Sequence, residues 1–181
     1  MEILDVVDED GNPTGQMIER AEAHKKGIRH RTAHVWLLRK SEAAVELLMQ
    51  KRSDRKDSNP GCYDVSSAGH IPAGVDFVSS AIREMQEELG LDITSEELIE
   101  CGNRSILNES VFYGKPFIDN QYSRVYAVWR DVEPDKLQLQ SSEVSAAVWI
   151  SYEKCLESVE NNLFPNCISL EELKMLQRLV I

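Results

Sequence analysis

A cluster of glutamates in one helix-forming segment constrains this chain more than any other feature. The segment runs from Gly69 to Leu91 and reads GHIPAGVDFVSSAIREMQEELGL. Asp76 has the side chain of an N-cap and Gly90 suits the position after a helix C-terminus, so we expect a helix over residues 77–89. Apolar residues at helical spacing form one stripe along it: Val78, Ala81, Ile82, Met85 and Leu89. The helix is therefore expected to pack against a core.

Three carboxylates of this helix lie beside its apolar stripe, where local energetics disfavour them. Glu84 and Glu88 are one turn apart, and their like charges cost roughly 0.2–0.5 kcal/mol. Glu87 and Glu88 also lie in the last turn, where the helix dipole favours cations. One interpretation is a solvated acidic face, in which Arg83 offsets part of the repulsion by reaching Glu87. The other is a site for hard divalent cations, which take oxygen ligands.

Length and composition predict one globular domain over residues 1–181. The chain is 42% hydrophobic and 28% charged, as in ordinary soluble proteins. Its net charge of −11 argues against nucleic-acid binding, because no basic surplus is available to neutralise phosphates. The four cysteines include no CxxC pair, so we expect reduced thiols rather than a zinc site. No apolar run approaches ~18 residues and the N-terminus is acidic, so we expect a cytoplasmic location and no membrane partner.

The remaining pattern predicts strands on both sides of the acidic helix. Residues 1–30 read as an N-terminal hairpin and a short helix over 20–26. Strands are expected over residues 2–7, 16–19, 33–38, 44–49, 99–112, 122–129 and 144–150, and further helices over 151–159 and from Ser169 onward. This order of elements predicts an α/β fold.

The acidic segment, residues 69–91, resembles the Nudix box, G-x5-E-x7-R-E-U-x-E-E-x-G-U, in which U is apolar. Gly69 matches the first glycine, and the run from Arg83 to Leu91 matches at every specified position. Val75 departs from the pattern, because it stands where the box has its first glutamate. In the family that glutamate mainly supports the loop, so its loss bears on catalytic strength more than on fold. The resemblance implies a Nudix-type α/β/α sandwich with a mixed β-sheet.

A longer stretch, about residues 4–91, is similar to the Nudix branch of isopentenyl-diphosphate isomerase and its hydrolase-like relatives. It contains VVDEDGNPTG, HKKGIRHRTAHVWLL and LLMQKRSDRKDSNPGCYDVSSAGH. Arg52 and Lys56 match the pair that anchors the substrate diphosphate in that branch. Without the resemblance, they would be interpreted as two solvated loop cations.

Histidines of the chain also match the isomerase. His30 and His70 correspond to its metal ligands, and His24 falls one residue from a third, although a single histidine is more often structural. The catalytic cysteine of the isomerase is replaced by Ala68, and no E-x-E pair follows in residues 113–125. These departures indicate a hydrolase built on the isomerase-like branch.

The resemblance implies metal-dependent hydrolysis of a phosphoanhydride in a nucleoside diphosphate derivative or a related organic diphosphate. Glu84, Glu87 and Glu88 are expected to hold Mg²⁺ or Mn²⁺, and Arg83 to orient a glutamate by ion pairing. Gly69 would let the loop pass close to the metal, because it has no Cβ. His70, beside it, is expected to line the substrate site.

The general base stays open between a box glutamate and a residue of a later loop, for which Glu143 and Glu109 are the candidates. Two other functions also stay open. One is an isopentenyl-diphosphate isomerase, and the other is a nucleotide-binding Nudix domain with little catalysis, which Val75 would explain. No motif identifies the substrate, and a homodimer is common in the family.

Overall fold

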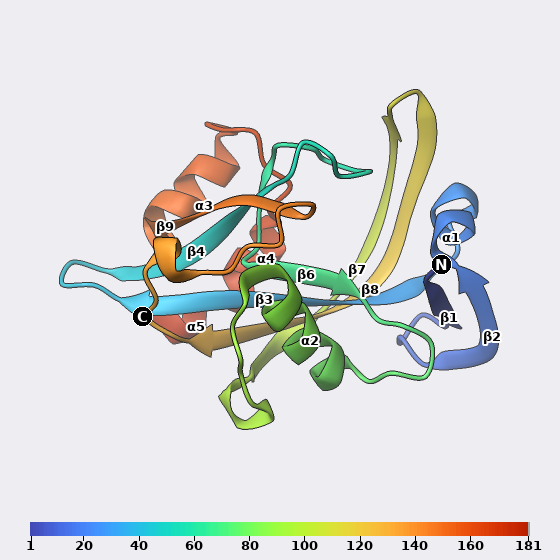
Figure 1. Ribbon diagram of the computed structural model, residues 1–181, viewed down its shortest axis with the longest axis horizontal. Coiled ribbons are helices and arrows are strands. Elements are labelled where there is room, and N and C mark those ends of the chain that lie inside the picture. Colours follow the sequence, from blue (N-terminus) through green and yellow to red (C-terminus); the bar gives the residue numbers. More distant parts are fainter. Residues whose placement is uncertain (181) are drawn as a thin grey trace.

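A mixed β-sheet between two layers of helices forms the body of the protein (Figure 1). The computed structural model describes residues 1–180. Within them the large sheet has the strand order β5-β4-β3-β8-β7, while β6 pairs with β3 and β9 with β4. β3 and β8 run parallel, and the other pairs of this sheet are antiparallel. Its strands are β3 (His30–Lys40), β4 (Val45–Arg52), β5 (Tyr63–Asp64), β6 (Ser67–His70), β7 (Ile99–Phe112), β8 (Lys115–Trp129) and β9 (Val144–Ser151).

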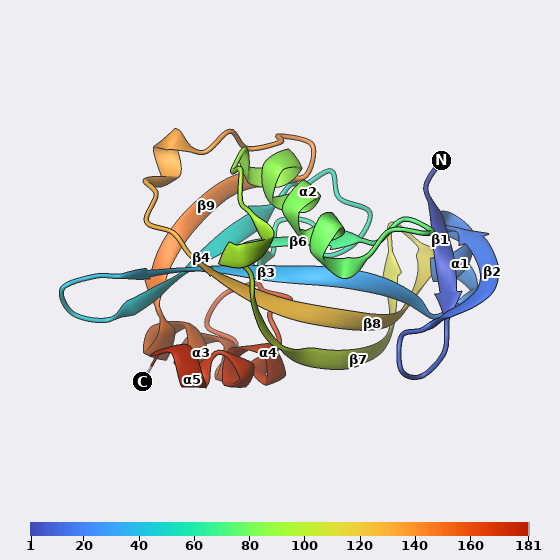
Figure 2. The ribbon, with the colours of Figure 1, turned by 90° about the horizontal axis from the view of Figure 1, so that it is seen from below.

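Helices cover both faces of this sheet (Figure 2). One face packs against α2 (Phe77–Leu89), and the other against α3 (Tyr152–Glu160), α4 (Leu170–Met175) and α5 (Gln177–Val180). Side chains of β3 alternate between the two cores: Trp36 and Leu38 belong to the cluster beneath α3 and α4, and Val35 and Leu37 to the cluster beneath α2. The predicted α/β sandwich with a mixed sheet is confirmed.

A separate hairpin precedes the sheet. β1 (Ile3–Val7) pairs antiparallel with β2 (Pro13–Glu19), and α1 (Arg20–Lys26) follows and ends at Gly27, whose φ is +66°. Ala73 donates its N–H to the carbonyl of Ile3, so β1 lies against the loop that leads into α2. This contact places the N-terminal elements at one end of the sheet (Figure 1).

Helix α2 has the bounds that its sequence predicts. Asp76 caps it by accepting the N–H of Ser79 at 2.8 Å, and Gly90 ends it with φ +67° and an N–H donated to the carbonyl of Gln86. Met85 and Leu89 of the predicted stripe are fully buried. Local signals therefore fix the helix that carries the three glutamates.

Strand β8 begins earlier than its sequence predicts. It pairs with β7 along almost its whole length. The first pair, next to the turn, joins Phe112 of β7 to Lys115 of β8. Its first residues include Asp119, Asn120 and Gln121, which have low strand propensity and concealed the strand. The remaining short elements are the 3₁₀ helices η1 (Ser95–Glu97) and η2 (Pro134–Lys136). None of the helices within residues 1–180 combines the length and apolar character needed to cross a membrane.

Candidate active site

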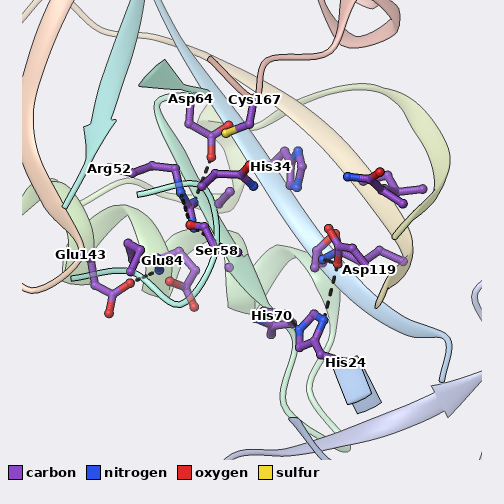
Figure 3. A pocket seen from close by; sticks show the side chains of 18 of the residues that line it. His24, His34, Arg52, Ser58, Asp64, His70, Glu84, Asp119, Glu143 and Cys167 are labelled. Atoms are coloured by element: carbon purple, nitrogen blue, oxygen red, sulfur yellow. Dashed lines mark hydrogen bonds and ion pairs between the residues drawn. The ribbon is translucent and has the colours of Figure 1, made fainter. Parts of the chain in front are cut away.

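A polar cleft of about 750 Å³ opens at one end of the sheet (Figure 3). Nine of the residues that the sequence nominates for the site line it: Arg52, Lys56, Gly69, His70, Arg83, Glu84, Glu87, Glu88 and Glu143. Glu109, the second candidate for a loop base, instead lies on an exposed part of β7. The chain thus gathers residues from α2, the β4–β5 loop, β6 and the segment before β9 around one hollow.

Glu88 is the most buried carboxylate of the acidic helix, with 4% of its surface exposed. Its Oε2 atom accepts hydrogen bonds from Gln50 Nε2 and from the N–H of Ala68, both at 3.1 Å. Burial raises the pKa of this carboxyl to about 7, and the nearby charge of Glu84 acts in the same direction. A carboxyl with this pKa can both accept and release a proton near neutral pH.

Glu84 lies directly against the backbone of Gly69. A Cβ at residue 69 would collide with the Glu84 carboxyl group, so any other residue here would displace that carboxylate. Burial raises the pKa of Glu84, although the charge of Arg83 opposes the shift. Arg83 donates to the Glu84 carboxylate and, at 3.2 Å, to the carbonyl of His70. Glu87 lies one helical turn after Arg83. It lines the cleft and its side chain is exposed to solvent.

Val75 is half-buried and packs against the core cluster beneath α2. The loop around it is held by a carboxylate from β1, because Asp5 Oδ2 accepts from Gly74 N and from Arg31 Nη2, both at 2.8 Å. The same Arg31 nitrogen donates to the carbonyl of Val75 at 2.9 Å. Asp5 thus supports the loop from a distant part of the chain, a role that the sequence pattern does not reveal.

The two cations of the β4–β5 loop are paired rather than solvated. Arg52 donates to Asp64 Oδ2 at 3.1 Å and to the carbonyl of Ser58 at 2.9 Å, and 13% of its side chain is exposed. Lys56 contacts the carboxylate of Glu143, and 15% of its side chain is exposed. The interpretation of these residues as free surface cations is therefore wrong.

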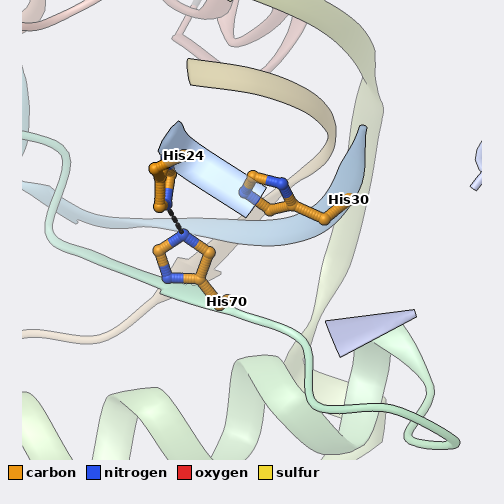
Figure 4. Close-up of side chains that lie close together, drawn as sticks. All are labelled: His24, His30 and His70. Carbon is orange, nitrogen blue, oxygen red and sulfur yellow. Dashed lines mark hydrogen bonds between the residues drawn. The ribbon is translucent and has the colours of Figure 1, made fainter. Parts of the chain in front are cut away.

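Three histidines from separate elements meet beside the cleft (Figure 4). His24 of α1, His30 of β3 and His70 of β6 have ligand atoms within 4.8 Å of one another. The Nε2 atoms of His24 and His70 are 3.0 Å apart, and Ile28 accepts a hydrogen bond from Nδ1 of His30 at 2.8 Å. Burial lowers the pKa of all three imidazoles, that of His24 to about 4. Neutral imidazoles in this arrangement are ligands suited to Zn or Mn.

The floor of the cleft is polar, which the sequence analysis missed. Thr32 Oγ1 donates to Gln121 Oε1 at 3.1 Å, and Gln121 in turn donates to Asp119. Burial raises the pKa of Asp119 to about 6. His34 and Arg104 also line this floor. Residues 30, 32 and 34 are polar and share one face of β3, which is the signal that would have found part of it.

Comparisons with known proteins identify the family of this chain. The family model described as NUDIX domain matches residues 28–166. The chain is 39% identical over 155 residues to Nudix hydrolase 3 of Arabidopsis thaliana, covering 84% of this chain and 20% of that protein. It is 35% identical over 162 residues to an uncharacterized Nudix hydrolase of Clostridium acetobutylicum, covering 90% and 76%. The chain thus spans only a fifth of the plant relative but most of the bacterial one.

Two further likenesses are more distant. The chain is 29% identical over 161 residues to isopentenyl-diphosphate Delta-isomerase 2 of Photorhabdus laumondii, covering 89% of this chain and 83% of that protein. The crystal structure of DR0079 from Deinococcus radiodurans superposes with a TM-score of 0.68 at 20% identity, covering 96% and 98% of the two chains. At that identity the structural likeness supports the fold alone.

Proposed function

Because this chain belongs to the Nudix family, we propose that it is a metal-dependent hydrolase of a phosphoanhydride bond in a nucleoside diphosphate derivative or a related organic diphosphate. The observation that carries this proposal is the convergence of Glu84, Glu87 and Glu88 with Arg52 and Lys56 on one cleft. Carboxylates suit a divalent cation and the two basic side chains suit phosphate oxygens. The cleft therefore offers both partners that a metal-bound diphosphate needs.

The carboxylates of α2 fit Mg²⁺ or Mn²⁺. Glu88 Oε2 already accepts two hydrogen bonds, which leaves Oε1 as its oxygen for a ligand. A buried carboxylate is costly without a compensating charge, and the raised pKa of Glu88 reflects that cost in the metal-free protein. A divalent ion held by these carboxylates would supply a Lewis acid that activates water and stabilises charge on the leaving phosphate.

The protein groups have distinct tasks in this proposal. Gln50 and the N–H of Ala68 fix the orientation of Glu88, which leaves its Oε1 atom to bind the ion. Arg83 holds Glu84 by an ion pair against the Gly69 backbone. Glu143 is the alternative base, lines the same cleft and contacts Lys56. The base stays open between a glutamate of α2 and Glu143, whose carboxylate is paired with Lys56 in the free protein.

We infer that the chain descends from the isomerase-like branch but does not isomerise. The identity with the Photorhabdus isomerase and the placement of Arg52 and Lys56 support the branch. Ala68, in place of the catalytic cysteine, provides no thiol for proton transfer. The polar floor of the cleft is also a poor match for a hydrocarbon tail, because buried polar groups would be left without partners.

A substrate panel tests the proposed hydrolysis. With Mg²⁺ or Mn²⁺, the purified protein is expected to release phosphate or a monophosphate ester from at least one nucleoside diphosphate derivative or organic diphosphate. Product release is measured by phosphate detection and chromatography. Binding by calorimetry without any product would indicate a nucleotide-binding domain, and conversion of isopentenyl to dimethylallyl diphosphate by NMR would indicate an isomerase.

We propose a second metal site at His24, His30 and His70, in keeping with the isomerase resemblance. After incubation with Zn²⁺ or Mn²⁺ and gel filtration, the wild type is expected to retain about one tightly bound ion, counted by elemental analysis. His24→Phe should lose it while keeping the stack of residue 24 on Phe117. His34→Asn, at the histidine outside the cluster, should keep it. Equal metal content in His24→Phe and the wild type would rule the cluster out.

A further inference from the structure

His34 and Arg104 meet at a single buried carboxylate below the floor of the cleft. Glu172, from α4, has 2% of its surface exposed. Its Oε1 atom accepts from His34 Nδ1 at 2.7 Å and from Arg104 Nη1 at 2.8 Å, and its Oε2 atom accepts from Trp36 Nε1 at 3.2 Å. Because His34 and Arg104 share one oxygen atom, their two side chains must lie next to each other.

Ion pairs hold these side chains in their charged forms, and Glu171 Oε2 also lies 3.8 Å from Arg104 Nε. Burial alone would raise the pKa of Glu172, but His34 and Arg104 lower it to about 2. Burial alone would lower the pKa of His34, yet the charge and hydrogen bond of Glu172 outweigh it and raise that pKa above its usual value. Glu172 thus faces an imidazolium and a guanidinium, and the guanidinium also faces Glu171, so two cations are paired with two carboxylates beneath the cleft.

Both cations have a nitrogen atom that makes no hydrogen bond within residues 1–180. His34 lines the cleft, and within residues 1–180 no hydrogen bond reaches its Nε2 atom (Figure 3). Arg104 Nε is buried and has no hydrogen-bond partner among the same residues, since Glu171 Oε2 lies 3.8 Å away, beyond hydrogen-bond distance. A buried donor without a partner costs free energy, so this part of the cleft is suited to a ligand that supplies an acceptor.

The rest of the floor restricts what that ligand can be. Thr32 donates a hydrogen bond to Gln121, and Gln121 donates one to Asp119. These three side chains therefore form a connected polar surface. A hydrocarbon placed here would leave these nitrogen atoms of His34 and Arg104 without a hydrogen-bond acceptor. An oxygen atom with negative or partial negative charge would satisfy them.

We propose that His34 and Arg104 form a specificity site that binds an oxygen acceptor on the organic group of the substrate, away from its diphosphate. This inference rests on the proposed function, which places the diphosphate at the carboxylates of α2. The site would favour substrates whose organic group carries carbonyl or hydroxyl oxygens and reject hydrocarbon diphosphates. Sites built to hydrogen-bond a substrate group discriminate strongly, because an analogue that lacks the group leaves buried partners unsatisfied.

Two substitutions of His34 separate its two nitrogens. Asn at position 34 places an amide nitrogen near Nδ1, so it keeps a donor for Glu172 and removes Nε2. Gln extends further and places its amide near Nε2, so it restores a donor to the cleft. Arg104→Gln is the second test, and Arg124→Gln is its matched control, because Arg124 pairs with Glu100 at 3.8 Å and does not line the cleft.

The probes are non-hydrolysable methylene analogues of uridine diphosphate, ribose 5-diphosphate and isopentenyl diphosphate, titrated by calorimetry into Mg²⁺-loaded protein. His34→Asn is expected to weaken binding of the uridine compound by about ten- to a hundredfold and to leave the isopentenyl compound within about twofold. His34→Gln should recover part of the loss. An equal loss for the ribose compound places the acceptor on the sugar, and a loss confined to the uridine compound places it on the base.

Equal effects of His34→Asn and Arg104→Gln on the uridine and isopentenyl compounds would overturn the specificity site. So would unchanged affinity of both variants for every probe, provided that thermal unfolding shows them folded. Because dissociation constants are measured without turnover, the test remains readable if the natural diphosphates are bound but never hydrolysed. That last outcome would count against the proposed hydrolysis alone.

Discussion

Replacing Glu88 by Gln is expected to lower kcat by about a hundred- to ten-thousandfold while the protein stays folded. The amide keeps the size of the side chain and can still accept from Gln50 and from the N–H of Ala68. It removes the charge that a divalent cation needs and the oxygen that can accept a proton. Turnover is measured at saturating substrate and limiting Mg²⁺. Wild-type rates under those conditions would refute the metal-site interpretation.

Glu87→Gln provides a matched comparison on the same helix. Its side chain is exposed, so the substitution should not disturb packing, yet it should also reduce turnover sharply if all three carboxylates hold the metal. Removing either charge from the last turn relieves repulsion with the helix dipole, so metal-free stability should hold or rise slightly. Circular dichroism and thermal unfolding check that both variants are folded.

The pH dependence of stability gives an independent readout of Glu88. Its pKa is raised in the folded protein from 4.5 to about 7, so its contribution to stability is complete below pH 4.5 and is lost as the pH rises through about 7. Metal-free wild type should therefore lose roughly 3 kcal/mol more than Glu88→Gln between pH 5 and pH 9. Denaturant unfolding at both pH values measures the difference. Parallel curves for the two proteins would contradict the buried, proton-binding state of Glu88.

The acidic helix could be predicted because its signals are local. Asp76, the apolar stripe and Gly90 lie within one short segment, and each acts through its immediate neighbours. The pairing of Arg52 with Asp64 could not be predicted in the same way, since Asp64 belongs to a two-residue strand with no pattern of its own. The fold class followed from the order of elements and from the resemblance.

Long-range polar contacts account for what the sequence did not reveal. Glu172 is 138 residues from His34, and only the packing of α4 against the sheet brings them together. Asp5 supports the loop at Val75, although no pattern in the acidic segment predicts a contact with β1. Such contacts depend on the tertiary fold, whereas caps, turns and apolar periodicity depend on a few adjacent residues.

Replacing Arg52 by Ala is expected to lower the free energy of unfolding by about 3–5 kcal/mol, in addition to raising KM. Asp64 is 9% exposed, and loss of Arg52 leaves its carboxylate buried without a cation. The carbonyl of Ser58 also loses its donor, so the β4–β5 loop loosens. If Arg52 also binds the diphosphate, KM should rise by about ten- to a hundredfold, because the bound substrate already carries that charge. Urea unfolding and steady-state kinetics measure the two effects.

A second substitution separates the stability effect from substrate binding. Asp64→Asn keeps an acceptor for the N–H of Val65 and removes the buried charge. The double variant Arg52→Ala with Asp64→Asn should therefore regain most of the lost stability. If the Arg52 guanidinium of the wild type binds the diphosphate, the KM of the double variant should stay high, because neither substitution supplies a cation. Recovery of both stability and KM in the double variant would show that Arg52 acts only by holding the loop, and would leave Lys56 as the cation of this loop available for the phosphates.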